Sequence, residues 1–240
     1  MRAMDLGIEG KVALVTAASA GLGLGCATAL SGEGCRVAIN GHDAARLDAA
    51  AASLGNDALA LAADVTDPDA PGALVAATVE RFGGLDILIA NAPGPPPARA
   101  LDVTDDALLD AVEANLLTSI RLVRAAVPHM RAAAWGRIVL VTSVTIKEPI
   151  PDLAASSAAR TGLWAWAKSA ARDLIGDGIT LNVLAPGLHD TDRVRALGHT
   201  GPTGDPADFG RIAAFLCSAH VAFVSGVALQ VDGAGTLGLL

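Results

Sequence analysis

The chain has no tyrosine, and its aromatic residues make up only 3% of 240 residues. The absence of tyrosine excludes a phenol, whose unperturbed pKa is about 10, as a proton donor anywhere in the protein. Long uncharged hydrophobic runs are missing too: the mean hydropathy is +0.47, but much of it comes from alanine, and no stretch approaches the length of a membrane span. We therefore expect no membrane association.

Basic residues are in the minority, with 17 Lys and Arg against 25 Asp and Glu and a net charge of −8. This balance predicts that no nucleic acid is a partner. Cysteine is also scarce, and Cys26, Cys35 and Cys217 lack the spacing of metal ligands. We expect them to be small buried side chains, and we expect no metal site. The first five residues lack the apolar run of a signal peptide, which favours a cytoplasmic location.

Strand-like and helix-like segments alternate along the whole chain, and a length of 240 residues suits one large core. The expected strands cover residues 11–16, 35–40, 58–62, 86–89, 137–142, 179–183 and 227–231. The expected helices cover residues 21–31, 43–53, 69–81, 105–131 (one or two helices), 153–174 and 208–217. This alternation predicts an α/β fold over 1–240: a single doubly wound parallel sheet of about seven strands, with helices on both faces.

The longest irregular segment, about 188–206, is rich in Gly, Thr and Asp. Such a segment is either a short lid over a substrate or a disordered loop.

A glycine-containing loop, Thr16 to Gly23, joins the first strand to its helix. Gly21 and Gly23 allow a backbone to approach a pyrophosphate at a helix N-terminus, where N–H groups and the helix dipole favour anions. A tight strand-to-helix turn would need similar residues, so the loop alone is weak support for a dinucleotide site.

Further motifs occur in a fixed order behind that loop. They are Asp64-Val65, Asn91-Ala92-Pro93, Asn115-Leu116, Ser143, Pro186-Gly187 and Val231-Asp232-Gly233. In this combination the chain resembles the short-chain dehydrogenase/reductase family over about residues 8 to 235. Segments 93–97 and 147–151 resemble its 3-oxoacyl-carrier-protein-reductase-like branch.

The resemblance implies a Rossmann-type fold that binds a nicotinamide dinucleotide. The residues it implies for the cofactor are Thr16, Ser19, Gly21, Leu22, Gly23, Asn40, His42, Asp64, Val65, Asn91, Ala92, Arg160, Pro186, Gly187, His189 and Thr191. Ala17 and Pro93 stand where the family has glycine. The acidic position that selects NAD(H) aligns with Gly41, so NADP(H) is favoured weakly over NAD(H). His42 is either a contact to the 2′-phosphate or a solvated loop residue.

The family's proton-transfer motif is altered. Thirteen residues after Ser143, where the family has tyrosine, stands Ser156, and four residues later Arg160 replaces the lysine. A serine hydroxyl is a much weaker acid than a phenol, and an arginine does not pass on a proton. The resemblance still implies a substrate hydrogen bond from Ser143, a ribose contact from Arg160, and a helix-kinking, water-holding role for Asn115.

Two other side chains are candidate proton donors. Lys147 lies on the loop after the fifth strand, and His189 follows Pro186-Gly187. Each is also explained as a solvated loop residue.

Three functions remain open at this point. The first is an atypical NAD(P)-dependent oxidoreductase that acts on a small carbonyl or alcohol, of acyl or polyketide-like type by analogy. The second is a non-catalytic dinucleotide-binding or structural partner protein, and the third is a lyase or dehydratase on the same fold. The family's long helices imply a homodimer or homotetramer, with Trp164 and Trp166 in an interface or core.

Overall fold

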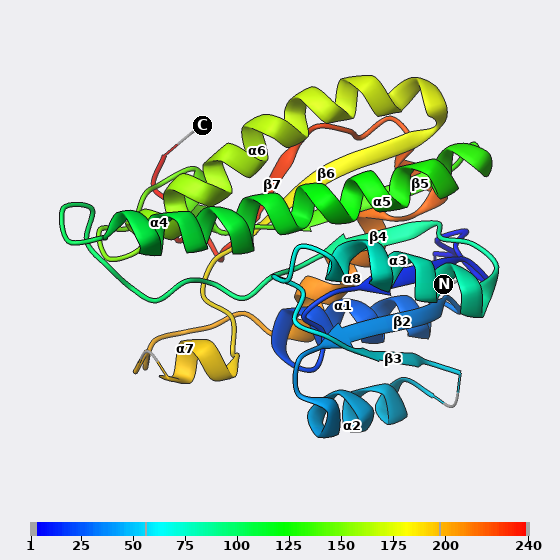
Figure 1. Ribbon diagram of the computed structural model, residues 1–240, viewed down its shortest axis with the longest axis horizontal. Helices are drawn as coiled ribbons and strands as arrows, with labels where there is room; N and C mark the ends of the chain where they lie inside the picture. The colour runs from blue at the N-terminus through cyan, green and yellow to red at the C-terminus, as the bar shows by residue number, and fades with distance from the viewer. Residues whose placement is uncertain (1–3, 56, 197, 239–240) are drawn as a thin grey trace.

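The computed structural model describes residues 4–55, 57–196 and 198–238, and their strands form one parallel sheet (Figure 1). The strands are β1 (Val12–Val15), β2 (Arg36–Gly41), β3 (Leu59–Ala62), β4 (Ile87–Ala90), β5 (Gly136–Val141), β6 (Ile179–Pro186) and β7 (Ala228–Val231). Their order in the sheet is β3-β2-β1-β4-β5-β6-β7. The expected doubly wound α/β sheet of seven strands is therefore confirmed.

The sequence of the central strands explains why the sheet is covered on both faces. Every residue of β1 (VALV), β4 (ILIA), β5 and β6 is buried. Continuous runs of this kind, rather than alternating ones, are typical of parallel strands with helices on both sides.

Eight α-helices surround the sheet in the described part of the chain. They are α1 (Gly21–Gly32), α2 (Ala44–Leu54), α3 (Ala70–Phe82), α4 (Asp105–Val112), α5 (Thr118–Ala132), α6 (Ala154–Leu174), α7 (Asp192–Ala196) and α8 (Pro206–Leu216). One core cluster joins α3, α5 and α6 to one face of the sheet, and a second joins α1, α2 and α8 to the other. None of these helices is both long and apolar enough to cross a membrane.

The predicted helix over 105–131 is interrupted. A π-helical turn, Glu113–Leu117, separates α4 from α5 and contains Asn115. The Asn115 side chain is buried at 1% exposure, and neither its oxygen nor its nitrogen has a hydrogen-bond partner among the described residues. A π turn therefore lies at the asparagine where the resemblance implies a helix kink, and the water-holding role of Asn115 stays a prediction.

Two glycines let α1 and α8 pack backbone against backbone. A Cβ atom on Gly25 would lie 2.2 Å from the carbonyl oxygen of Pro206, and one on Gly210 would lie 2.1 Å from the carbonyl oxygen of Gly25. No real side chain tolerates such distances, so both positions require glycine. α1 therefore packs directly against α8, although the two helices are far apart in the sequence.

Candidate functional site

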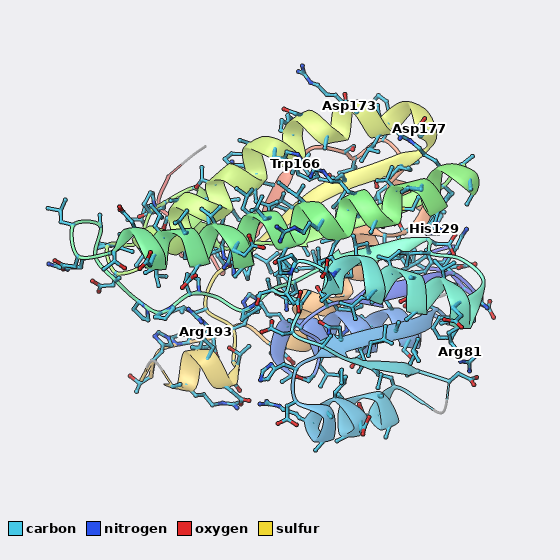
Figure 2. All side chains as sticks on the ribbon, in the orientation of Figure 1. Arg81, His129, Trp166, Asp173, Asp177 and Arg193 are labelled. Carbon is cyan, nitrogen blue, oxygen red and sulfur yellow. The ribbon has the colours of Figure 1, made fainter. Side chains whose placement is uncertain are left out.

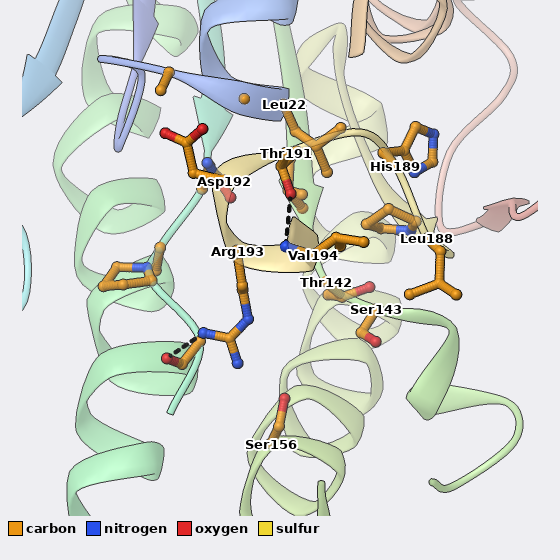
Figure 3. A pocket seen from close by; sticks show the side chains of 18 of the residues that line it. Leu22, Thr142, Ser143, Ser156, Leu188, His189, Thr191, Asp192, Arg193 and Val194 are labelled. Atoms are coloured by element: carbon orange, nitrogen blue, oxygen red, sulfur yellow. Dashed lines mark hydrogen bonds between the residues drawn. The ribbon is translucent and has the colours of Figure 1, made fainter. Parts of the chain in front are cut away.

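A cavity of about 380 Å³ lies at the carboxyl ends of β1, β4, β5 and β6 (Figure 3). β1 and β4 are the neighbours at which the strand order reverses, and ligands of open α/β sheets bind at such a switch point. The cavity is lined by Ser19, Ala20, Gly21, Leu22, Arg46, Asn91, Ala92, Pro93, Gly94, Val141, Thr142, Ser143, Leu153, Ser156, Arg160, Pro186, Gly187, Leu188, His189, Thr191, Asp192, Arg193 and Val194.

The loop before α1 presents backbone N–H groups to this cavity. Ala20, the N-cap of α1, makes no side-chain capping bond, and the first turn of the helix has no acidic residue. The N–H groups at this end are therefore not satisfied by the helix's own side chains. Gly21, the first helical residue, has a φ of +56° and brings the chain close to Thr191. These features suit an anion at the N-terminus of α1.

Three predicted cofactor residues form hydrogen bonds that hold the loop, and one of them, Asn91, also lines the cavity. Thr16 donates to the carbonyl oxygen of Asn91 at 2.6 Å and accepts from its N–H at 3.0 Å. Asn91 in turn donates to the carbonyl oxygen of Ala17 at 3.1 Å. The amide of buried Asn40 donates to the carbonyls of Leu61 and Ala63. The side chains of Thr16 and Asn40 thus stabilise the loop, and their part in binding a cofactor stays a prediction.

Other predicted contacts lie outside the lining of the cavity. These are Gly23, His42, Asp64 and Val65. Gly23 packs so tightly that a Cβ would lie 2.3 Å from the Ala17 carbonyl oxygen. Asp64 accepts hydrogen bonds from the N–H and hydroxyl of Thr66, which lower its pKa.

Ala17, where the resemblance has glycine, takes a left-handed backbone conformation with a φ of +46°. That conformation costs an L-residue about 1–2 kcal/mol. Replacing alanine by glycine also makes the unfolded chain more flexible, which lowers the free energy of unfolding by about 0.4–1 kcal/mol. Ala17→Gly should therefore raise the free energy of unfolding by about 0.5–1 kcal/mol, measured by urea denaturation. Ala18→Gly, at a buried neighbour without this conformation, is the matched control and should destabilise; equal effects of the two changes would contradict the argument.

Ser143 and Ser156 face the cavity from β5 and α6 (Figure 3). Ser143 accepts a hydrogen bond from the N–H of Thr145 at 3.2 Å, which fixes its side chain at the end of β5. Ser156 is buried and accepts from Nε of Arg160 at 3.3 Å. The structure therefore brings together three of the predicted catalytic residues: Ser143, Ser156 and Arg160.

Two other catalytic candidates are not in the cavity lining. The ammonium of Lys147 lies 4.2 Å from the ring centroid of Trp164, so Lys147 packs against α6 instead of facing the cavity. Asn115 lies in the buried π turn. A cation–π contact thus holds the half-buried Lys147 side chain, and its role as a proton donor stays a prediction.

His189 lines the cavity but is only 4% exposed, which excludes a solvated loop residue. Its ring packs edge-on against Phe209 at 5.2 Å, and Nδ1 lies 3.2 Å from the carbonyl oxygen of Gly187. These contacts hold the turn after Pro186-Gly187 in place.

The segment 188–206 forms more structure than its sequence indicates, although residue 197 lies outside the described residues. It contains α7 and a bridge between His189 and Gly204. Arg193 of α7 donates to the carbonyl oxygens of Gly94 and Pro95 at 2.9 and 3.0 Å. The described part of the segment is thus ordered and tied to the loop after β4, and its role as a short lid over a substrate stays a prediction.

The lid is tied on its other side to α2. Asp192 forms ion pairs with Arg46 and with Arg195. No motif pointed to Arg46 or Arg193, because their place in the cavity depends on which helices meet there. Arg46 is the third residue of α2 and is placed by Asp43, which caps that helix by accepting from the Arg46 N–H.

Comparison with known proteins assigns this arrangement to a class of dinucleotide-dependent enzymes. The sequence pattern of the short chain dehydrogenase family matches residues 11–201. The chain belongs to the short-chain dehydrogenase/reductase family. It is similar to the 3-oxoacyl-[acyl-carrier-protein] reductase of Vibrio cholerae, with 33% identity over 95% of this chain and 98% of the relative.

Solved structures show the same fold around bound cofactors. L-sorbose reductase from Gluconobacter frateurii, complexed with NADPH and L-sorbose, has a TM-score of 0.90 at 29% identity, covering 96% of this chain and 98% of its own. A 3-oxoacyl-(acyl-carrier-protein) reductase from Agrobacterium tumefaciens, with NADP bound, has a TM-score of 0.88 at 30% identity over 95% of each chain. The chain is therefore an oxidoreductase-type member of the family.

Proposed function

We propose that the protein is an NADP(H)-dependent oxidoreductase acting on a small carbonyl or alcohol, with an atypical proton-transfer site. One observation carries the proposal: a single cavity joins an uncapped helix N-terminus to the hydroxyls of Ser143 and Ser156. The relatives bind NADPH or NADP, which is consistent with this cavity.

The residues of the cavity fit a nicotinamide dinucleotide. The N–H groups of Gly21 and Leu22 would hold the pyrophosphate, since they lie at the positive end of α1. Pro186, Gly187 and Thr191 line the side formed by the end of β6 and would face the nicotinamide half. The bound cofactor would supply or accept a hydride.

The protein's own task would be to orient the carbonyl and supply a proton. Ser143 would donate to the substrate oxygen, as its position at the end of β5 allows. Ser156 would be the direct proton donor or would hold a water that donates. Arg160 polarises the Ser156 hydroxyl through its Nε–H but cannot relay a proton. We therefore infer a substrate that needs little acid catalysis, such as a carbonyl whose product anion is delocalised.

The missing carboxylate at residue 41 predicts a preference for NADP(H). A Cβ on Gly41 would lie 3.1 Å from Cβ of Ser19, so the end of β2 leaves little room for an acidic side chain. NADPH should bind at least as tightly as NADH in a direct fluorescence titration, because no carboxylate repels a 2′-phosphate there. Clearly tighter NADH binding would contradict the preference, and failure of both to bind would overturn the proposed function.

The same titration separates the enzyme from a binding protein. Tight NADPH binding without turnover of any carbonyl or alcohol would favour a non-catalytic dinucleotide-binding protein. A substrate that is dehydrated without any change in NADPH absorbance would favour the lyase alternative.

We also propose a homodimer or homotetramer. A hollow of about 270 Å³ lies between α5 and α6, and its apolar part consists of Val123, Val127, Trp166 and Leu174. Figure 2 labels Trp166 and Asp173 on α6. Arg124, Arg131 and Asp173 line the same hollow, so each copy offers both charge signs around an apolar centre. Such a patch suits a two-fold interface. Light scattering at micromolar concentration should report two or four chains, and a monomer would contradict the prediction.

A cytoplasmic location and a small-molecule partner remain part of this proposal.

A further inference from the structure

Arg160 is a buried cation with only neutral hydrogen-bond partners. It is 6% exposed and donates to Ser156 Oγ and to the carbonyl oxygens of Val141 and Thr142. Within the described residues, no carboxylate accepts a hydrogen bond from it. Buried charges are normally paired, because an unpaired charge in a protein interior is costly.

A second guanidinium shares the cavity. Arg193 also donates only to carbonyl oxygens, those of Gly94 and Pro95, among the described partners. Figure 3 shows its side chain extending from α7 toward the space that Ser143 and Ser156 face. Burial, and then the charge of Arg193, lower the pKa of Arg160 to about 10, so Arg160 stays charged at neutral pH and the two guanidiniums are close enough to interact.

The carboxylates that line the cavity do not neutralise the charges of Arg160 and Arg193. Its described lining contains a single carboxylate, Asp192, and this side chain is already paired with Arg46 and Arg195. The lining of this cavity therefore has an excess of positive charge, although the whole chain has a net charge of −8. The N-terminus of α1 would receive the cofactor phosphates, whereas Arg193 contacts the carbonyl oxygens of Gly94 and Pro95 in the loop after β4.

We propose that this site takes a substrate with a free carboxylate, an oxo acid rather than a neutral ketone or a thioester, whose carboxylate lies between Arg160 and Arg193. The second terminal nitrogen of Arg160 donates to none of the described residues, and Arg193 is exposed at the mouth of the cavity, so both guanidiniums have N–H groups left for a carboxylate. Charge-assisted hydrogen bonds of this kind are stronger than neutral ones. This inference rests on the proposed function and adds a carboxylate to the substrate. It concerns binding, and the low need for acid catalysis is a separate requirement on the carbonyl. It also gives Arg160 a task that a lysine on the same helix would perform less well.

The test compares acids with their own methyl esters. A panel of straight-chain 2-oxo and 3-oxo acids of four to eight carbons, each beside its methyl ester, is titrated calorimetrically into the NADP⁺-saturated protein. We expect at least one acid to bind about 10- to 100-fold more tightly than its ester, the range for a charged hydrogen-bonded pair. If every acid in the panel binds no more tightly than its ester, the proposal is wrong.

Variants on the lid assign the effect to one side chain. Arg193→Gln should weaken binding of that acid about 10-fold or more, leave the ester unchanged and leave NADPH affinity unchanged. Arg193→Lys should retain part of the acid affinity, because it keeps the charge without the fork. Arg195→Gln is the matched control on α7, since Arg195 lies outside the cavity lining and pairs with Asp190 and Asp192.

The outcomes distinguish this proposal from the proposed function. Equal losses of acid and NADPH binding in Arg193→Gln would assign the arginine to the cofactor and overturn the oxo-acid proposal alone. If the wild type binds neither NADPH nor NADH, the proposed function fails, and the acid preference is then measured on the cofactor-free protein.

Discussion

Ser156→Tyr combined with Arg160→Lys should give the protein measurable reductase activity on simple ketones, which the wild type should reduce poorly or not at all. Reducing an unactivated ketone needs a proton as the alkoxide forms, and general acid catalysis contributes about 10²–10⁴-fold. Ser156 lines the cavity, so a tyrosine at this position would extend into a space of about 380 Å³ toward Ser143. The measurement is NADPH oxidation with a panel of small ketones.

A matched control isolates the hydroxyl group. Ser156→Phe with Arg160→Lys fills the same space and keeps the lysine but offers no proton, so it should stay inactive. Brisk reduction of simple ketones by the wild type would show that another group or a water already donates. Activity in neither form, with NADPH bound by both, would favour the non-catalytic alternative.

Gly21→Val should abolish NADP(H) binding, with at least a 100-fold loss of affinity. Gly21 has a φ of +56°, which is a strained conformation for a β-branched residue and costs about 1–3 kcal/mol. Its new Cβ would lie 3.2 Å from the Thr191 side chain, in the lining of the cavity. A changed turn would move the N–H groups that are proposed to hold the pyrophosphate. The measurement is a fluorescence titration with NADPH.

The control lies on the same helix. A Cβ on Gly32, near the end of α1, would meet nothing within 4 Å, so Gly32→Val should leave NADPH affinity unchanged. Circular dichroism checks that both variants are folded. Normal NADPH binding by a folded Gly21→Val protein would show that the phosphate loop is elsewhere.

The fold was predictable because its signals are local. Buried parallel strands read as apolar runs, and each expected strand agrees with an observed one to within about three residues, the largest difference being β6, which continues to Pro186. The π turn at Glu113–Leu117 was not predictable in detail, since one extra residue in a turn leaves the apolar pattern of a long helix almost unchanged. The helix α7 was missed because its five residues carry too little periodicity.

The site was predictable only where a motif marks it. Ser143, Ser156 and Arg160 were found by spacing, and the cavity does bring them together. Lys147 was predicted from its place after the fifth strand. Its ammonium instead contacts the ring of Trp164, which lies one helical turn beyond Arg160. Arg193 carries no sequence signal, because its proposed role comes from sharing a cavity with another guanidinium that lies 33 positions earlier in the chain.

The glycine contact between α1 and α8 has a consequence for the order of events during synthesis. The helix that is proposed to receive the cofactor phosphates is made from residues 21–32, but its seat includes Gly210 and the carbonyl of Pro206. In a nascent chain that ends before α8, one side of α1 is exposed to solvent. The apolar residues that Phe209 and Ala213 cover are exposed as well. α1 therefore reaches its final position only after α8 has been made, and we expect the proposed cofactor site to be complete only then.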